Sequence, residues 1–258
     1  MTTSDSPVAL VTGANKGIGA EVARLLAMRG LTVLAGSRDP GRGAAAAAAQ
    51  RDASGGDVRA IDLDVTDANN VAAAAARIED ELGRLDVLVN NAAIAGVTGS
   101  GRPSETPTAT FRELLETNVI GVVAVTNAVL PLLRRAPAGR IVMVSSELGS
   151  ITAMLDPGSP MWPMASIPYP VSKTALNMVT AMYAKELLGT PVKVNAANPG
   201  YCATDLNGHS GFRTAAQGAE PIVHLATLPD DGPTGTFHGH MWVTDPAPDQ
   251  PEYGELAW

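Results

Sequence analysis

Two patterns of hydrophobic and polar positions alternate along the chain. Short apolar runs rich in β-branched residues occur at 8–11, 31–34, 58–61, 87–90, 140–145 and 192–197, and they have the length of buried strands. Longer segments with helical character lie between them, at 17–29 and from about residues 42, 67, 107 and 169. Strands that alternate with helices at this spacing predict a mostly parallel sheet with helices on both faces. The expected fold class is α/β.

The segments without such a pattern are short, and they read as loops of one domain. Stretches rich in proline and glycine lie at 95–107, 156–170 and 229–235, each beside a regular element. The alanine-rich stretches 44–49 and 72–76 predict surface helices, because alanine is the strongest helix former. Thr106 before Pro107 has the pattern of an N-cap followed by proline at the first helical position. A chain of 258 residues fits a single compact domain.

Composition narrows the class of partner. Hydrophobic residues make up 45% of the chain, enough for a substantial core, and the net charge of -8 argues against nucleic acid and anionic membranes. The longest apolar stretch, 119–133, is interrupted by polar residues and proline and is too short to span a bilayer, so it predicts a buried helix. We expect a small-molecule partner and no membrane association.

Cysteine and histidine give little sign of special chemistry. Cys202 is the only cysteine, and the N-terminal residues lack the charged and apolar regions of a signal peptide, so a cytoplasmic location is expected. Only His238 and His240 are close in sequence, without a third ligand nearby, so no metal site is expected.

Three glycines, Gly13, Gly17 and Gly19, lie where the first predicted strand turns into the first predicted helix. Glycine permits a tight turn and lets the backbone approach a pyrophosphate, whose charge then lies at the helix N-terminus. The alternative is a glycine turn that only packs helix against strand. Because these glycines open a strand–helix–strand unit, they favour nucleotide binding.

The end of the second predicted strand bears on the choice of dinucleotide. Arg38 stands where the adenosine ribose would lie, and arginine can pair with a 2′-phosphate. Arg42 and Lys16 could add positive charge there, although solvated surface charge is the alternative for all three. NADP(H) is therefore expected, while Asp39 beside Arg38 leaves NAD(H) open.

Several motifs together resemble the short-chain dehydrogenase/reductase family over nearly the whole chain. Thr12-Gly13-Ala-Asn-Lys-Gly17-Ile-Gly19 resembles its TGxxxGIG loop, Asn90-Asn91-Ala92-Ala93 its NNAG motif and Tyr169-Pro-Val-Ser-Lys173 its YxxxK motif. Asn198-Pro199-Gly200 followed by Thr204-Asp205 resembles the segment that closes over the nicotinamide, and the wording TGANKGIG resembles the carbonyl reductase branch. The resemblance implies a single-domain, doubly wound Rossmann fold with a seven-stranded sheet, in which residues 1–90 mainly bind the dinucleotide, 91–245 carry catalysis and substrate binding, and 246–258 form a C-terminal tail. The cofactor-binding residues that it implies are Gly13, Asn15, Lys16, Gly17, Ile18, Gly19, Arg38, Arg42, Asp64, Val65, Asn90, Tyr169, Lys173, Pro199, Gly200 and Thr204.

The same resemblance assigns catalysis to Asn118, Ser146, Tyr169 and Lys173. Tyr169 would give a proton to the carbonyl oxygen, and Lys173, one helical turn away, would lie on the same face. A unit charge at ~5 Å with an effective dielectric of ~20 is worth about 3 kcal/mol, so Lys173 is expected to lower the pKa of Tyr169 by roughly 2 units, with burial opposing part of this. Adjacent strand residues face opposite sides, so only one of Ser145 and Ser146 should reach the substrate carbonyl, and the resemblance favours Ser146. Asn118, expected mid-helix, would hold a water that relays protons to Lys173, or would be a buried structural asparagine.

Two departures from the family pattern affect the loops. Ala93 replaces the usual glycine of NNAG and could restrict that backbone. Ser146 and Tyr169 are 23 positions apart, about ten more than is usual, so a segment is inserted before the tyrosine. Met154, Met161, Trp162 and Met164 in and around this insertion would line an apolar substrate pocket or form a minor core, with 202–212 as a second pocket wall. The insertion also favours a monomer over a homo-oligomer.

The predicted function is the reversible, NADPH-dependent reduction of an aldehyde or ketone to an alcohol. The alternatives are an NAD-dependent alcohol dehydrogenase of the same family, and a dinucleotide-sensing protein without catalysis. Retention of both Tyr169 and Lys173 favours an enzyme. The sequence leaves the natural substrate open, because substrate pockets are built from variable loops.

Overall fold

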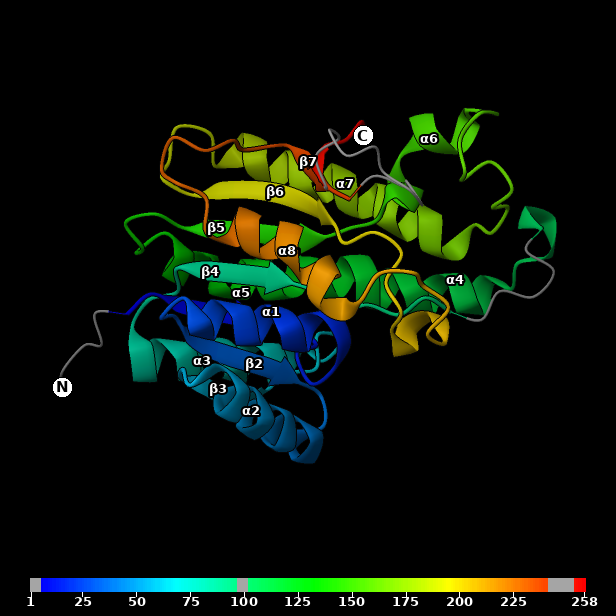
Figure 1. Ribbon diagram of the computed structural model, residues 1–258. Coiled ribbons are helices and arrows are strands. Elements are labelled where there is room, and N and C mark those ends of the chain that lie inside the picture. The colour runs from blue at the N-terminus through cyan, green and yellow to red at the C-terminus, as the bar shows by residue number, and fades with distance from the viewer. Residues whose placement is uncertain (1–5, 97–101, 241–252) are drawn as a thin grey trace.

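The computed structural model describes residues 6–96, 102–240 and 253–258. Within these residues the chain forms one doubly wound α/β unit around an eight-stranded sheet in the order β3-β2-β1-β4-β5-β6-β7-β8 (Figure 1). Every neighbouring pair is parallel except β7 and β8. The strands are β1 Val8–Val11, β2 Thr32–Ser37, β3 Val58–Asp62, β4 Val87–Asn90, β5 Arg140–Val144, β6 Lys193–Asn198, β7 Phe237–Gly239 and β8 Gly254–Glu255.

The predicted α/β class and mostly parallel sheet are confirmed, whereas the count of seven strands is wrong by one. The extra strand, β8, lies in the expected C-terminal tail and pairs antiparallel with β7. It has only two residues and no apolar alternation, so nothing in its sequence marks it as a strand. Parts of the predicted loop 95–107, of the predicted catalytic half 91–245 and of the tail lie outside the described residues.

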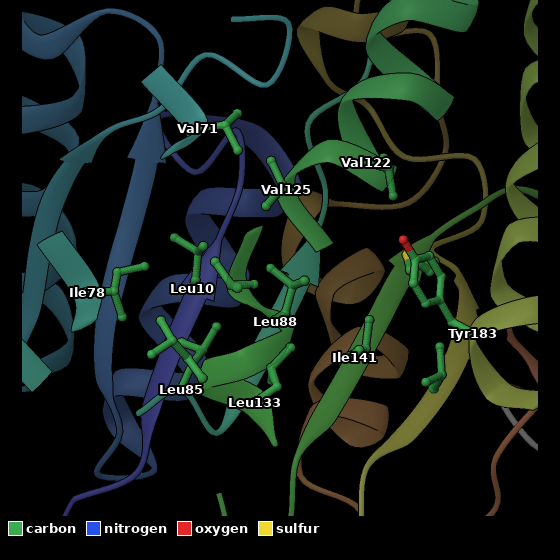
Figure 2. Close-up of a cluster of buried hydrophobic side chains, with 14 of the residues drawn as sticks. Leu10, Val71, Ile78, Leu85, Leu88, Val122, Val125, Leu133, Ile141 and Tyr183 are labelled. Atoms are coloured by element: carbon green, nitrogen blue, oxygen red, sulfur yellow. The ribbon is translucent and has the colours of Figure 1, made fainter. Parts of the chain in front are cut away.

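Helices cover both faces of the sheet. Apolar residues of α3, α5 and α7 form one buried cluster, shown in part in Figure 2, and those of α1 and α8, with Ala47 of α2, form the other. The helices are α1 Gly17–Met28, α2 Pro40–Ser54, α3 Ala68–Leu82, α4 Thr108–Leu115, α5 Gly121–Leu133, α6 Ile151–Leu155, α7 Pro168–Glu186 and α8 Ala215–Ala226. Short 3-10 turns lie at Pro103–Glu105, Glu147–Gly149 and Asp205–Asn207, and a π-helical turn, η2, covers Glu116–Ile120.

Several predicted boundaries are confirmed and one cap is wrong. Asp67 caps α3 by accepting from the backbone N–H groups of Asn69 and Asn70, so this helix begins where the sequence indicates. The helix expected from Pro107 begins at Thr108 instead, with Pro107 itself as the N-cap, because Thr106 closes the preceding 3-10 turn.

The apolar stretch 119–133 falls in η2 and α5, as expected of a buried helix. Val122, Val125, Val129 and Leu133 pack in the core against the sheet. Among the described residues, the continuous helical segment Thr108–Leu133 has the length and hydropathy of a membrane-spanning helix. Core helices of soluble proteins share these properties.

Candidate active site

A cleft of about 430 Å³ opens at the carboxyl edge of the parallel strands, where open α/β sheets bind their ligands. Most of the residues that the sequence analysis predicted to bind the dinucleotide line it. They are Gly13, Asn15, Lys16, Gly17, Ile18, Gly19, Arg38, Asp64, Val65 and Thr204. The other predicted residues, Arg42, Asn90, Tyr169, Lys173, Pro199 and Gly200, lie outside this lining.

The glycine loop is held open by the segment after β4. Gly13 and Gly17 have φ of +63° and +57°, a backbone conformation that glycine tolerates. A Cβ at Gly13 would lie 2.9 Å from Cα of Ala92. The side chain of Asn91, which the sequence analysis placed in the NNAG-like motif without a role, donates to the carbonyl oxygens of Thr12 (2.8 Å) and Gly13 (3.1 Å). The loop is thus a preformed cradle at the N-terminus of α1, with glycines at its tightest positions, and it fits the pyrophosphate of a dinucleotide.

The residue after Asn91 and Ala92 does not disturb this cradle. Among the described residues other than glycine, only His209 has a positive φ, so Ala93 adopts a conformation open to any L-residue. The expected restriction at Ala93 is therefore absent. Asn90 is buried, and its amide nitrogen donates to Oγ1 of Thr126 at 3.0 Å.

The charged residues after β2 take different roles. Arg38 lines the cleft. Asp39 caps α2, accepting from the backbone N–H of Arg42 at 2.9 Å, and pairs with the Arg42 guanidinium at 3.3 Å. Arg42 is thereby drawn toward Asp39, and neither residue lines the cleft. Lys16 lines the cleft and pairs with Asp205 at 2.6 Å.

A second group of polar side chains gathers where β5 ends and α7 begins. Lys173 lies one turn after Tyr169 on α7, with its Nζ 5.5 Å from the centre of the Tyr169 ring. Nζ donates to the carbonyl oxygen of Val144 at 2.7 Å. The Ser146 hydroxyl accepts from the backbone N–H of Leu148 at 3.2 Å and lies near enough to the Tyr169 hydroxyl to influence its pKa. Ser145 is directed elsewhere, because its hydroxyl donates to Oδ1 of Asn177 at 2.5 Å.

Burial controls the protonation of this pair. Burial raises the pKa of Tyr169 to about 12, against the opposing effect of the hydrogen bond with Ser146. Burial also lowers the pKa of Lys173 to about 7. The expectation that Lys173 lowers the Tyr169 pKa is therefore wrong for the protein without a ligand. Lys173 is itself buried and only partly charged near neutral pH, so its attraction for a phenolate is smaller than that of a full charge.

Asn118 connects the cleft to α7. It lies in the π-helical turn η2 rather than in a regular helix, and such turns are frequent at functional sites. Its amide accepts from the N–H of Ile94 and donates to the carbonyl oxygen of Ile94, both at 2.9 Å. It also donates to the Ser172 hydroxyl at 3.0 Å. Asn118 therefore ties the loop after β4, which lines the cleft at Ile94, to the helix that carries Tyr169.

The inserted segment contains α6, which lies just before the predicted loop 156–170 and was not assigned to any element in the sequence analysis. Met161 is fully buried, whereas Trp162 and Met164 are exposed, so the four apolar residues singled out here do not form one cluster. Cys202 is buried, its Sγ donates to the carbonyl oxygen of Pro199 at 3.2 Å, and burial raises its pKa to about 11.

Fold and site together define a dinucleotide-binding α/β protein with a tyrosine–lysine pair beside the cofactor cleft. A family model described as short chain dehydrogenase matches residues 7–212. (+)-Neomenthol dehydrogenase from Capsicum annuum is 31% identical, with 94% of this chain and 98% of that protein covered. The short-chain dehydrogenase anuI from Penicillium roqueforti is 36% identical, covering 86% and 88%. The structure of salutaridine reductase from Papaver somniferum superposes with a TM-score of 0.76 at 31% identity, covering 90% of this chain and 99% of that one. The chain belongs to the short-chain dehydrogenase/reductase family and is an oxidoreductase.

Proposed function

We propose that the protein is an NADPH-dependent reductase that converts the carbonyl group of an aldehyde or ketone to an alcohol, with Tyr169 as the general acid. The observation that carries this proposal is the convergence of Ser146, Tyr169 and Lys173 at the carboxyl edge of the sheet. The names of the relatives agree with it, since one relative is a dehydrogenase of neomenthol, an alcohol, and another is a reductase.

The hydroxyl group of Ser146 lies near enough to that of Tyr169 to lower its pKa, so both hydroxyls can turn to donate to one carbonyl oxygen. With a pKa of about 12, Tyr169 holds its proton at neutral pH and can donate it as negative charge develops on that oxygen. The dinucleotide, when bound, supplies the hydride.

Lys173 is the group that returns a proton to Tyr169 after the reaction. Its pKa of about 7 makes both protonation states available near neutral pH, which suits proton transfer. Its Nζ is 5.5 Å from the Tyr169 ring centre, close enough to stabilise the phenolate left after proton donation. The family resemblance also assigns it to the nicotinamide ribose.

The different positions of Arg38 and Asp39 after β2 support a preference for NADP(H). Arg38 lines the cleft and can pair with a 2′-phosphate, whereas the carboxylate of Asp39 is used to cap α2 and to bind Arg42. An acidic side chain that recognised a free ribose hydroxyl would have to face the cleft instead. The remaining expectations, a cytoplasmic monomer that binds neither nucleic acid nor membranes, belong to the same proposal.

The test is the rate of NADPH oxidation, compared with NADH, for a panel of aldehydes, ketones, α-keto esters and quinones. We expect turnover with NADPH preferred, and loss of turnover in Tyr169→Phe. Tyr183→Phe is the matched control, because the Tyr183 hydroxyl lies on the same helix but donates to Asn127. Full activity in Tyr169→Phe, or preference for NADH, would overturn the mechanism or the cofactor assignment respectively.

A further inference from the structure

Arg213 is a buried arginine with no ion-pair partner among the described residues. Only 9% of its surface is exposed, and its Nε is buried without a hydrogen-bond acceptor. Among the described residues, no carboxylate or carbonyl group pairs with its guanidinium. The other buried arginine, Arg140, is bound by the carbonyl oxygen of Leu228 at 2.7 Å and by Asp230 at 3.1 Å. A buried charge is costly unless it is paired. The difference between Arg140, which is paired, and Arg213, which is not, therefore indicates that Arg213 binds an anion.

The surroundings of Arg213 hold its guanidinium in place. The Phe212 ring centre lies 5.5 Å from Cζ, in cation–π contact. A Cβ at Gly200 would lie 2.9 Å from Nε of Arg213 and 3.0 Å from Cβ of His240, so the absence of a side chain at Gly200 makes room for the guanidinium. The cation–π contact uses none of the guanidinium N–H groups, so they remain able to donate to a carboxylate.

The position of Arg213 indicates which anion it would meet. Arg213 lies in the segment after β6, and its backbone forms a β-bridge with that of Cys202. Its side chain lies beside Gly200, at the edge of the sheet where ligands bind. Another part of the same segment, Thr204 to Leu206, lines the dinucleotide cleft, whereas Arg213 does not. A phosphate group of the dinucleotide is therefore a poor match, and a negatively charged group on the second reactant is a better one.

We propose that Arg213 binds the carboxylate of a carbonyl substrate, so that the enzyme accepts oxo acids as well as neutral aldehydes and ketones. The inference rests on the proposed function for the position of the reacting carbonyl at Tyr169. Arg213 touches no reacting atom in this scheme and acts as a specificity residue.

The experiment compares benzoylformate with its ethyl ester as substrates, in the wild type and in Arg213→Gln, Arg213→Lys and Arg134→Gln. Arg134 is the control, an exposed arginine whose partner is Glu186. In Arg213→Gln we expect kcat/KM to fall roughly 10- to 100-fold for the acid, the effect of losing hydrogen bonds to a charged group, and to change little for the ester. Arg213→Lys should keep part of the activity toward the acid, and Arg134→Gln should match the wild type. Equal losses for acid and ester, or an unchanged rate for the acid, would overturn the proposal.

A binding measurement separates this inference from the proposed function. Calorimetric titration with benzoate, and with benzamide as the neutral counterpart, needs no turnover. Stronger binding of benzoate that is lost in Arg213→Gln supports the anion site even if no carbonyl compound is reduced. If benzoate fails to bind the wild type, or binds Arg213→Gln equally well, the proposed anion site is wrong, even if the ester is reduced.

Discussion

Replacement of Lys173 by methionine is expected to stabilise the fold at pH 6 and to abolish the reductase activity. Methionine has a similar length and no charge, so it fits an apolar environment without desolvation of an ammonium group. Lys173 is 2% exposed, and within the part of the chain that the structure describes its Nζ donates only to the Val144 carbonyl oxygen. The site thus contains a group whose charged form is disfavoured by folding.

The magnitude follows from the lowering of the Lys173 pKa from 10.5 to about 7. Each pKa unit corresponds to about 1.4 kcal/mol, so the protonated side chain costs the folded state at most about 5 kcal/mol. Loss of the hydrogen bond to Val144 and relaxation around the charge reduce the net gain, and we expect about 2 kcal/mol. For a protein of this size that is an increase in Tm of roughly 4–8 °C.

The sign of the pH dependence distinguishes this effect from a general change in packing. Below pH 7 both folded and unfolded chains carry the proton on Lys173, so the cost is present in full. Between pH 7 and 10.5 the unfolded chain binds the proton and the folded chain has released it, so the stability of the wild type rises with pH relative to the variant. The advantage of Lys173→Met should therefore shrink steadily toward pH 10.

Urea unfolding from pH 6 to 9.5 measures this difference and stays below the range in which Tyr169, with its pKa of about 12, contributes. Lys185→Met is the matched control, because Lys185 is exposed on the same helix. A stability difference between the wild type and Lys173→Met that is constant with pH would refute the conclusion that folding lowers the pKa of Lys173.

Three further outcomes are expected. Tyr169→Phe should lower kcat by about 10²- to 10⁴-fold while the Kd for NADPH, measured by fluorescence, stays within twofold; weaker NADPH binding of the same size would indicate a binding role instead. Arg38→Gln should raise the KM for NADPH by roughly 10- to 100-fold and leave that for NADH unchanged, and a parallel rise for both would exclude recognition of the 2′-phosphate. Sedimentation velocity should show a monomer of 26.5 kDa, and a stable tetramer would contradict the proposed effect of the insertion.

The sheet could be predicted because its strands are buried on both faces. Runs such as 8–11 and 87–90 coincide with β1 and β4, since a strand covered on both sides must be apolar throughout. The elements that were missed lack this constraint. β8 is a pair of residues at the sheet edge, and α6 is a single short helix in the insertion, so neither leaves a periodic pattern long enough to detect.

The sequence predicts which residues form the site more easily than it predicts their pKa values or hydrogen-bond partners. The motif spacing places Tyr169 and Lys173 on one face of a helix, and the structure places them there. Their pKa values depend on how much water the tertiary structure excludes, which spacing does not encode. The same holds for Arg213, an ordinary arginine in the sequence that stands out because its buried Nε has no hydrogen-bond acceptor among the residues that the structure describes.

The burial of Lys173 itself can be traced to a residue outside the motifs that identify the family. A Cβ at Gly149 would lie 2.8 Å from the backbone carbonyl carbon of Lys173 and 3.0 Å from its Cβ. The missing side chain lets the turn Glu147–Gly149 pack directly on α7, and Thr174 reinforces this contact by donating to the Gly149 carbonyl oxygen at 3.0 Å. A larger residue at position 149 would separate the turn from the helix and admit water toward the ammonium group. Burial lowers the pKa of Lys173, and the close packing of this turn against α7 contributes to that burial.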